Sequence, residues 1–145
     1  MCDRGERLAP RAAVVLLAGA LLGAAGQERT TVWDGVYTEA QAERGRVAYA
    51  MSCASCHADD LRGRSTAPSL IEESFAFLWD DMSLGDLFER TRTRMPSDRP
   101  GSLSGPVYAD ILAFIAQKNG YPAGPKELGD DLAVLKGIRI TAKPR

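Results

Sequence analysis

Two cysteines and the only histidine of the 145-residue chain stand within five positions, in the string Cys53-Ala54-Ser55-Cys56-His57. Two thiols three positions apart can each add to one of the two vinyl groups on adjacent edges of a porphyrin, and this string is typical of covalent haem c attachment. A histidine directly after the second thiol can turn its imidazole beneath the ring and bind the iron. We therefore expect one haem c, attached through Cys53 and Cys56, with His57 as an axial iron ligand.

Three other chemistries use similar residues. A thioredoxin-like dithiol follows a buried strand, whereas residues 44–51 have the pattern of an amphipathic helix. A zinc site needs a fourth ligand and usually a second ligand pair, and no such pair is present elsewhere in the chain. A plain structural disulfide would use the two cysteines alone. The motif favours haem over all three.

A haem with one histidine needs a sixth iron ligand or keeps an open site. Because His57 is the only histidine, ligation by two histidines of this chain is excluded. Met51 is too close to the attachment string to reach the other face of the haem, and Met82 could fill the core. Met95 stands directly before Pro96 in a polar loop, where a methionine has no obvious packing role. The sequence therefore predicts Met95 as the second axial ligand, with Met82 or a five-coordinate haem as alternatives.

Helical patterns dominate the chain, and convincing strand alternation is absent. Thr38 can cap a first helix, with Gln41 as its capping-box partner, and Ser83 and Ser104 can cap later helices. Gly120 is placed to end the strongest helix, whose apolar stripe includes Phe114. The predicted helices cover residues 38–53, 72–79, 84–92, 105–120 and, in a shorter stretch, 130–136. We expect an all-α domain of three to four short helices joined by long loops.

Length and composition agree with this expectation. The chain is 45% hydrophobic and 26% charged, as in an ordinary globular domain, and its net charge of −1 gives no basic excess for binding nucleic acid. A domain of this size with short helices and long loops has a thin core, and such domains often need a metal or cofactor for stability.

The first 26 residues have the pattern of a secretory signal. Charged residues precede an uncharged run over positions 12–25, and small residues follow at Ala24 and Gly26. We expect cleavage, export to the periplasm and a mature domain of residues 27–145, with a C-terminal extension from about residue 121. An uncleaved segment would act as a membrane anchor, although the run is shorter than the roughly 17–25 residues of a spanning helix.

The chain resembles the class I, monohaem c-type cytochromes, particularly bacterial exported cytochromes that accompany quinoprotein alcohol dehydrogenases. The resemblance covers roughly residues 32–140. It rests on Gly45-x-x-x-Tyr49, the string 53–57, Ala67-Pro68-x-Leu70, Met95-Pro96 and the aromatic Phe114. It implies a cytochrome c-like fold of three to four short helices wrapped around one covalently bound haem. It also implies that the first and last long helices cross where Gly45 and Tyr49 pack on Phe114. It also implies that the Pro68 carbonyl accepts a hydrogen bond from the His57 imidazole, and that Met95 binds the iron.

Further residues are candidates for the haem surroundings. Leu70, Leu87 and Phe88 could form the pocket wall, and Trp33 and Trp79 could lie near the haem edge or simply in the core. Arginines gather on both sides of the proposed site. They could be a solvated surface, neutralise haem propionates, or steer an acidic partner. These arginines are Arg62, Arg64, Arg90, Arg92, Arg94 and Arg99.

Together these features predict an electron carrier rather than an enzyme. With both axial positions filled, iron can cycle between ferrous and ferric states with little rearrangement. The expected partners are a dehydrogenase, with a quinoprotein as the candidate class, and a terminal oxidase or another cytochrome. The alternatives are a peroxidase-like haem enzyme or sensor with an open distal site, and a thiol-disulfide protein.

Overall fold

The computed structural model describes residues 30–144, so the predicted signal segment lies outside the described part of the chain. This part is all-α, as predicted, with isolated β-bridges but no strand. It has six helices, more than the three to four expected, because two very short ones, α2 and α6, accompany the four longer ones. They are α1 (Glu39–Ser52), α2 (Ala54–His57), α3 (Glu72–Trp79), α4 (Leu84–Arg94), α5 (Gly105–Lys118) and α6 (Leu132–Lys136). Among the described residues, no helix is long and apolar enough to cross a membrane.

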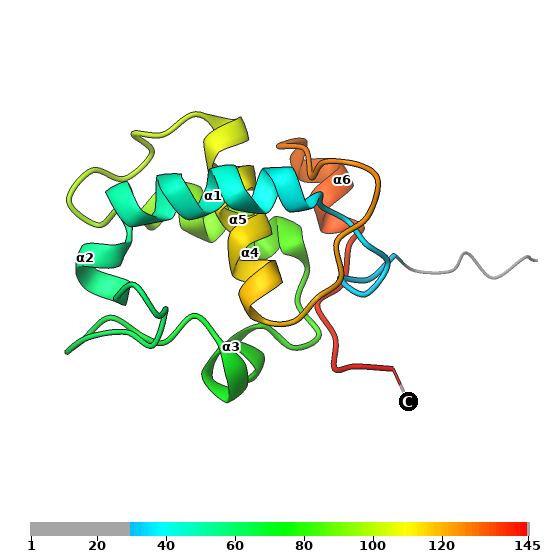
Figure 1. Cartoon of the computed structure of the whole chain (residues 1–145), viewed down its shortest axis with the longest axis horizontal. Helices are drawn as coiled ribbons and strands as arrows, with labels where there is room; N and C mark the ends of the chain where they lie inside the picture. The colour runs from blue at the N-terminus through cyan, green and yellow to red at the C-terminus, as the bar shows by residue number, and fades with distance from the viewer. Residues whose placement is uncertain (1–29, 145) are drawn as a thin grey trace, which may run out of the picture.

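Helices α1 and α5 cross each other (Figure 1), and Gly45 of α1 lies at the crossing. A Cβ atom on Gly45 would lie 1.8 Å from the Asp110 carbonyl oxygen and 3.0 Å from the Phe114 Cβ, so no larger residue fits without moving the backbone. One turn later, the rings of Tyr49 and Phe114 pack with centroids 5.3 Å apart. The expected contact of Gly45 and Tyr49 with Phe114 is therefore confirmed, and the closest approach is to the α5 backbone at Asp110.

The caps of α1 and α4 differ from each other. Thr38 accepts the Gln41 N–H as predicted, but the buried Gln41 side chain does not complete a capping box. Its amide instead donates to the Leu128 carbonyl at 2.8 Å and accepts the Leu128 N–H at 2.7 Å. The Gln41 side chain thereby satisfies both backbone groups of Leu128, in the segment after α5. A capping-box hydrogen bond would have satisfied only the Thr38 N–H. Ser83, in contrast, forms a complete capping box with Asp86.

Two other helix ends correct the sequence prediction. Helix α4 continues to Arg94 rather than ending at residue 92, because only the residue before Pro96 is forced out of helical geometry. Met95 is that residue, with extended φ and ψ of −127° and 150°. Ser104 occupies the N-cap position of α5 as predicted, but its side chain makes no capping hydrogen bond.

The residues after 121 pack into the domain together with the segment before α1. Val32 donates its N–H to the Arg139 carbonyl at 2.9 Å, and Tyr37 donates its hydroxyl to the Tyr121 carbonyl at 2.6 Å. The Trp33 indole N–H donates to the Thr141 carbonyl at 2.9 Å. The indole N–H of Trp33 thus joins the two ends of the described chain.

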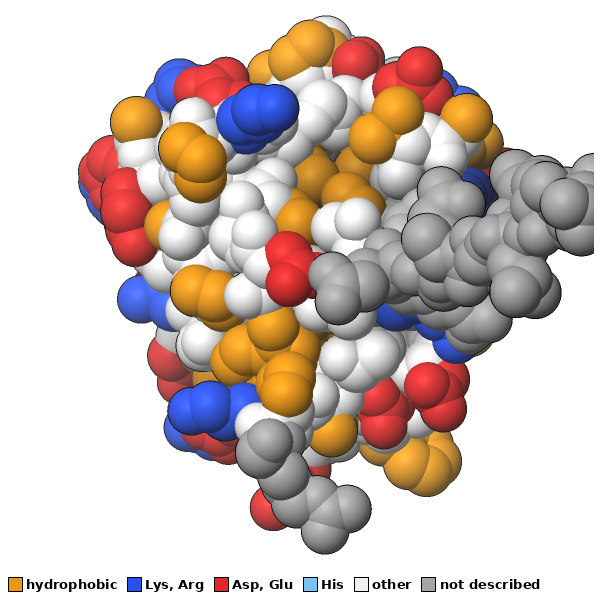
Figure 2. All heavy atoms as spheres, turned by 90° about the vertical axis from the view of Figure 1, so that its right-hand side faces the viewer, with side chains coloured by type: hydrophobic (Ala, Val, Ile, Leu, Met, Phe, Trp, Pro, Cys, Tyr) orange, Lys and Arg blue, Asp and Glu red, His pale blue; other side chains and the backbone are white. Residues whose placement is uncertain are grey.

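Helix α6 is packed against α4. A Cβ on Gly85 would lie 2.6 Å from the Lys136 backbone nitrogen, so this glycine allows the two helices to approach closely. The Lys136 ammonium contacts Asp86 at 2.5 Å and Glu89 at 3.2 Å. Figure 2 shows the side of the molecule that carries α6 and the C-terminal end, where Lys and Arg are interspersed with Asp and Glu over the visible surface.

Candidate haem site

The attachment string spans the junction between α1 and α2. Cys53 is the residue between the two helices, and its carbonyl accepts the N–H groups of Cys56 at 3.2 Å and His57 at 2.9 Å. Because residues three positions apart in a helical turn share one face, the two thiols lie on one side of the segment. Cys53 is half-buried, Cys56 is exposed, and the two are not joined in a disulfide.

The imidazole of His57 is oriented by a backbone carbonyl. Its Nδ1 lies 2.9 Å from the Pro68 oxygen, the contact that the sequence resemblance implied. Because a carbonyl only accepts hydrogen bonds, Nδ1 must carry the proton, which leaves the lone pair of Nε2 free to bind a metal. A histidine held in this way has the tautomer and the fixed orientation of an axial iron ligand.

A glycine that the sequence prediction did not single out brings Pro68 to this position. Gly63 has a φ of +81°, and a Cβ on it would lie 2.3 Å from the Ala67 oxygen and 2.8 Å from the Pro68 carbonyl carbon. Its N–H donates to the His57 carbonyl at 3.0 Å. The loop can thus fold back tightly against α2 only with glycine at this position.

The end of α5 holds the neighbouring Leu70. The Asn119 side chain donates to the Leu70 carbonyl at 3.0 Å and accepts the Glu72 N–H at 3.1 Å. Leu70 itself is half-buried against the core, and its role in the pocket wall stays a prediction. Sequence reasoning missed Asn119, although an asparagine at the end of a helix is a common capping signal.

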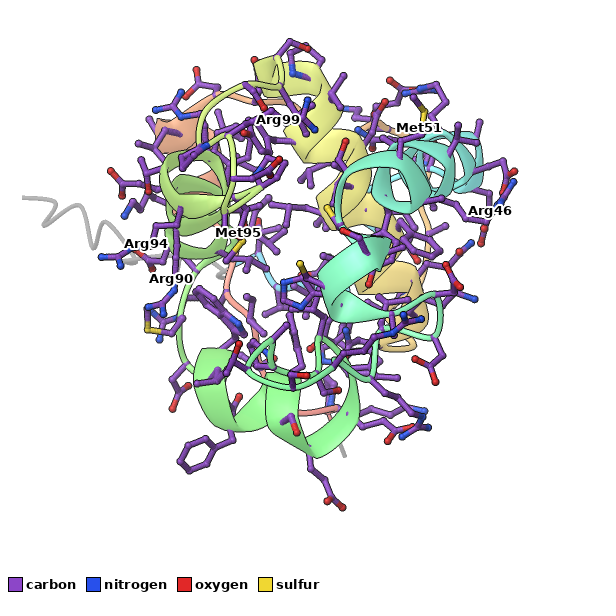
Figure 3. All side chains as sticks on the ribbon, turned by 90° about the vertical axis from the view of Figure 1, so that its left-hand side faces the viewer. Arg46, Met51, Arg90, Arg94, Met95 and Arg99 are labelled. Carbon is purple, nitrogen blue, oxygen red and sulfur yellow. The ribbon has the colours of Figure 1, made fainter. Side chains whose placement is uncertain are left out.

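Met95 lies at the C-terminal end of α4 and is half-buried. Its N–H donates to the Thr91 carbonyl at 2.8 Å, and its own carbonyl accepts the Tyr108 hydroxyl at 2.7 Å. Figure 1 places α2 and the loop after α4 at the same end of the molecule, and in Figure 3 the Met95 side chain points inward from the end of α4.

The other two methionines of the described chain are more exposed. Met51 is 79% exposed, and Met82 is 39% exposed between α3 and α4. The suggestion that Met82 fills the core is therefore wrong, since the core positions beside it belong to Trp79 and Leu84.

The apolar candidates on α4 point inward, and the arginines point outward. Leu87 and Phe88 are buried, and the Phe88 ring packs edge-to-face on Tyr108. Trp79 is also buried, with the Arg90 guanidinium 6.0 Å from its ring centroid, so it has a core position. Arg92 lies similarly over the Phe88 ring, at 5.6 Å.

The arginines differ in their ionic partners. Arg62 pairs with Glu72 and Arg99 with its neighbour Asp98. Within residues 30–144, the structure shows no ion pair for Arg64, Arg90, Arg92 or Arg94. A positive charge thus remains on the outer side of α4, next to Met95 (Figure 3).

The thiol-disulfide and zinc alternatives fit this site poorly. Burial, and secondly the neighbouring Cys56, raise the pKa of the Cys53 thiol to about 11, whereas reactive dithiols need a lowered pKa. Among the described residues, no three His, Cys, Asp or Glu side chains are grouped to hold a metal ion. Two free thiols beside an imidazole with one available nitrogen do fit covalent haem.

An all-α domain with this attachment string defines a c-type cytochrome. A family model described as "Cytochrome C oxidase, cbb3-type, subunit III" matches residues 40–115, about half of the chain, and the chain belongs to this family. It is therefore a monohaem c-type cytochrome, whose domain binds covalent haem c with its iron. No curated protein and no solved structure matches the chain.

Proposed function

We propose that this cytochrome is an exported single-electron carrier whose haem is attached at Cys53 and Cys56 and ligated by His57 and Met95. The observation that supports it best is the 2.9 Å contact between His57 Nδ1 and the Pro68 carbonyl, directly beside the two thiols. This contact leaves one imidazole nitrogen for iron, and Met95 lies at the same end of the molecule (Figures 1 and 3).

The bound haem supplies reversible one-electron chemistry at iron. The chain's own residues keep the surroundings constant between the two oxidation states. The Pro68 carbonyl fixes the His57 ring. We expect the buried Phe88 and Leu87, with the half-buried Leu70, to exclude water from a bound haem. A thioether ligand and an apolar pocket both favour ferrous iron, which raises the reduction potential.

The proposed ligand pair also bears on the alternative of a haem enzyme or sensor. Peroxidase-like chemistry needs an open distal position, usually with an acid/base group beside it. Since the chain contains one histidine, no second imidazole can serve there. A filled sixth position favours transfer of electrons over binding of a substrate at iron.

Export and partners are part of the same proposal. The uncharged run at residues 12–25 supports secretion to the periplasm. The family's printed name associates it with an oxidase, which supports a terminal oxidase or another cytochrome as electron acceptor. As donor we propose a dehydrogenase, with the quinoprotein class suggested by the sequence resemblance.

Replacing Met95 tests this function directly. In the holoprotein, Met95→Ala should retain covalent haem, lose the thioether-to-iron absorption band, lower the reduction potential and let added imidazole bind iron. Met82→Ala, at a methionine that is 39% exposed, is the matched control and should change none of these.

Three results would count against the proposal. Equal spectra and potentials for wild type and Met95→Ala would remove Met95 as ligand. A high-spin spectrum of the wild type would favour an open-site enzyme or sensor. A colourless chain after extraction with acid and solvent would remove covalent haem itself.

A further inference from the structure

We propose that Tyr108 is a positioning residue for the iron ligand, and that its hydroxyl, by holding the Met95 carbonyl, sets how firmly the thioether stays on the iron. This inference rests on the His57/Met95 ligation proposed above. It assigns to α5 a function beyond its packing against α1.

The contact joins a buried side chain to a backbone carbonyl. Tyr108 is 1% exposed, and its hydroxyl donates to the Met95 carbonyl oxygen at 2.7 Å. Its ring packs edge-to-face on Phe88, with centroids 6.4 Å apart. Phe88 is fully buried and lies about two turns before Met95 on α4. The position of the hydroxyl is therefore fixed by the packing of α5 against α4.

The Met95 backbone is held from both sides. Its N–H bonds the Thr91 carbonyl within α4, and its carbonyl accepts the Tyr108 hydroxyl. A carbonyl at a helix end has no partner within the helix, so a side chain from another element must satisfy it. Pro96, directly after Met95, is buried, and residues 97–102 then form an exposed loop with a turn in which the Arg99 N–H donates to the Pro96 carbonyl.

This arrangement bears on ligand strength because Met95 must compete with water and other donors for iron. A ligand on a fixed backbone loses little conformational freedom when it binds, whereas one on a mobile backbone loses more. Partners that hold a metal ligand in place typically change metal affinity by about 10- to 100-fold when removed. We expect Tyr108 to act in this way on the iron–thioether bond.

The chain provides its own control for a purely structural role. Three buried tyrosines each donate to a backbone carbonyl: Tyr108, Tyr37, which binds the Tyr121 carbonyl at 2.6 Å, and Tyr49, which binds the Ala58 carbonyl at 2.8 Å. Tyr37 joins the segment before α1 to the C-terminal tail, away from Met95. Removing the Tyr37 hydroxyl therefore also breaks one buried hydrogen bond to a backbone carbonyl, but leaves the Met95 backbone unchanged.

The experiment compares Tyr108→Phe with Tyr37→Phe in the holoprotein, using imidazole as the probe ligand. Both variants should lower the denaturant midpoint of unfolding to a similar extent. Only Tyr108→Phe should lower the imidazole concentration that half-saturates ferric iron, by about 10-fold, and weaken the thioether-to-iron band. In a Met95→Ala background, Tyr108→Phe should have no further effect on imidazole binding.

The outcomes separate this inference from the function on which it rests. If Met95→Ala behaves as expected but Tyr108→Phe binds imidazole like Tyr37→Phe, the positioning role is wrong and the ligation stands. An effect of Tyr108→Phe that persists in the Met95→Ala background would also overturn it, because Met95 would not then transmit it. If Met95→Ala leaves the spectrum unchanged, the ligation itself fails.

Discussion

The two sides of the proposed haem site are built differently. On the attachment side, Cys53, Cys56 and His57 are contiguous in sequence, and the carbonyl that orients His57 follows eleven residues later in an adjoining loop. On the other side, Met95 stands alone at the end of α4, and its carbonyl is held by Tyr108 from a different helix. The first side is thus specified locally, whereas the second depends on how α4, α5 and α6 pack together.

The largest effect should follow from breaking the attachment side. Replacing Cys53 and Cys56 together by alanine should abolish covalent haem, because no other thiol of the described chain is available. Mass spectrometry of the denatured protein, with the Met95→Ala variant as the haem-bearing control, measures this. A haem-sized increment on the double variant would show that the attachment side has been misidentified.

The crossing of α1, which leads into the attachment side, with α5, which carries Tyr108, should be nearly as sensitive to substitution. Gly45→Ala places a methyl group 1.8 Å from the Asp110 carbonyl, so α1 and α5 must separate, at a cost of about 3 kcal/mol in unfolding free energy. Gly129→Ala, where nothing lies within 4 Å of the new atom, should change stability little. Chemical denaturation compares the two; similar midpoints would mean that the crossing tolerates a methyl group.

A moderate effect is expected from the charge beside Met95. Arg94→Glu should slow oxidation of the reduced protein by ferricyanide, an anion, several-fold at low salt, and the difference should shrink as salt screens the field. Arg46→Glu is the control, since Arg46 pairs with Glu43 and lies on another side of the molecule (Figure 3). Equal slowing by both variants would indicate net charge rather than a local surface.

The smallest effect concerns the α4–α6 contact. The Lys136 ammonium, followed by the Ser83 hydroxyl and N–H, lowers the pKa of Asp86 to about 2. A carboxyl with a lowered folded pKa contributes stability above its unfolded value, near pH 4, and this contribution is lost as the pH falls towards 2.

Stability measured between pH 4 and 2 should therefore fall less steeply for Asp86→Asn than for wild type. Asp81→Asn, at a side chain that is 88% exposed, is the control. A slope for Asp86→Asn equal to that of wild type would show that this carboxyl does not stabilise the packing of α6 on α4.

Local sequence determined much of this protein. The cysteine and histidine spacing, the capping residues Thr38 and Ser83, and the periodicity of α5 predicted the all-α class and the positions of the main helices, because these signals act within one or two turns of chain. The extent of α4 was misjudged by two residues, since a proline restricts only the residue before it.

Tertiary structure alone decided the contacts between distant segments. Gln41 binds Leu128 rather than its own helix end, Asn119 holds Leu70, and Tyr108 holds Met95. Each joins a side chain to a backbone group at least 13 positions away, and only the packed helices bring such partners within reach. Backbone groups left unpaired by loops and helix ends must find partners wherever packing provides them, and no local pattern in the sequence names those partners.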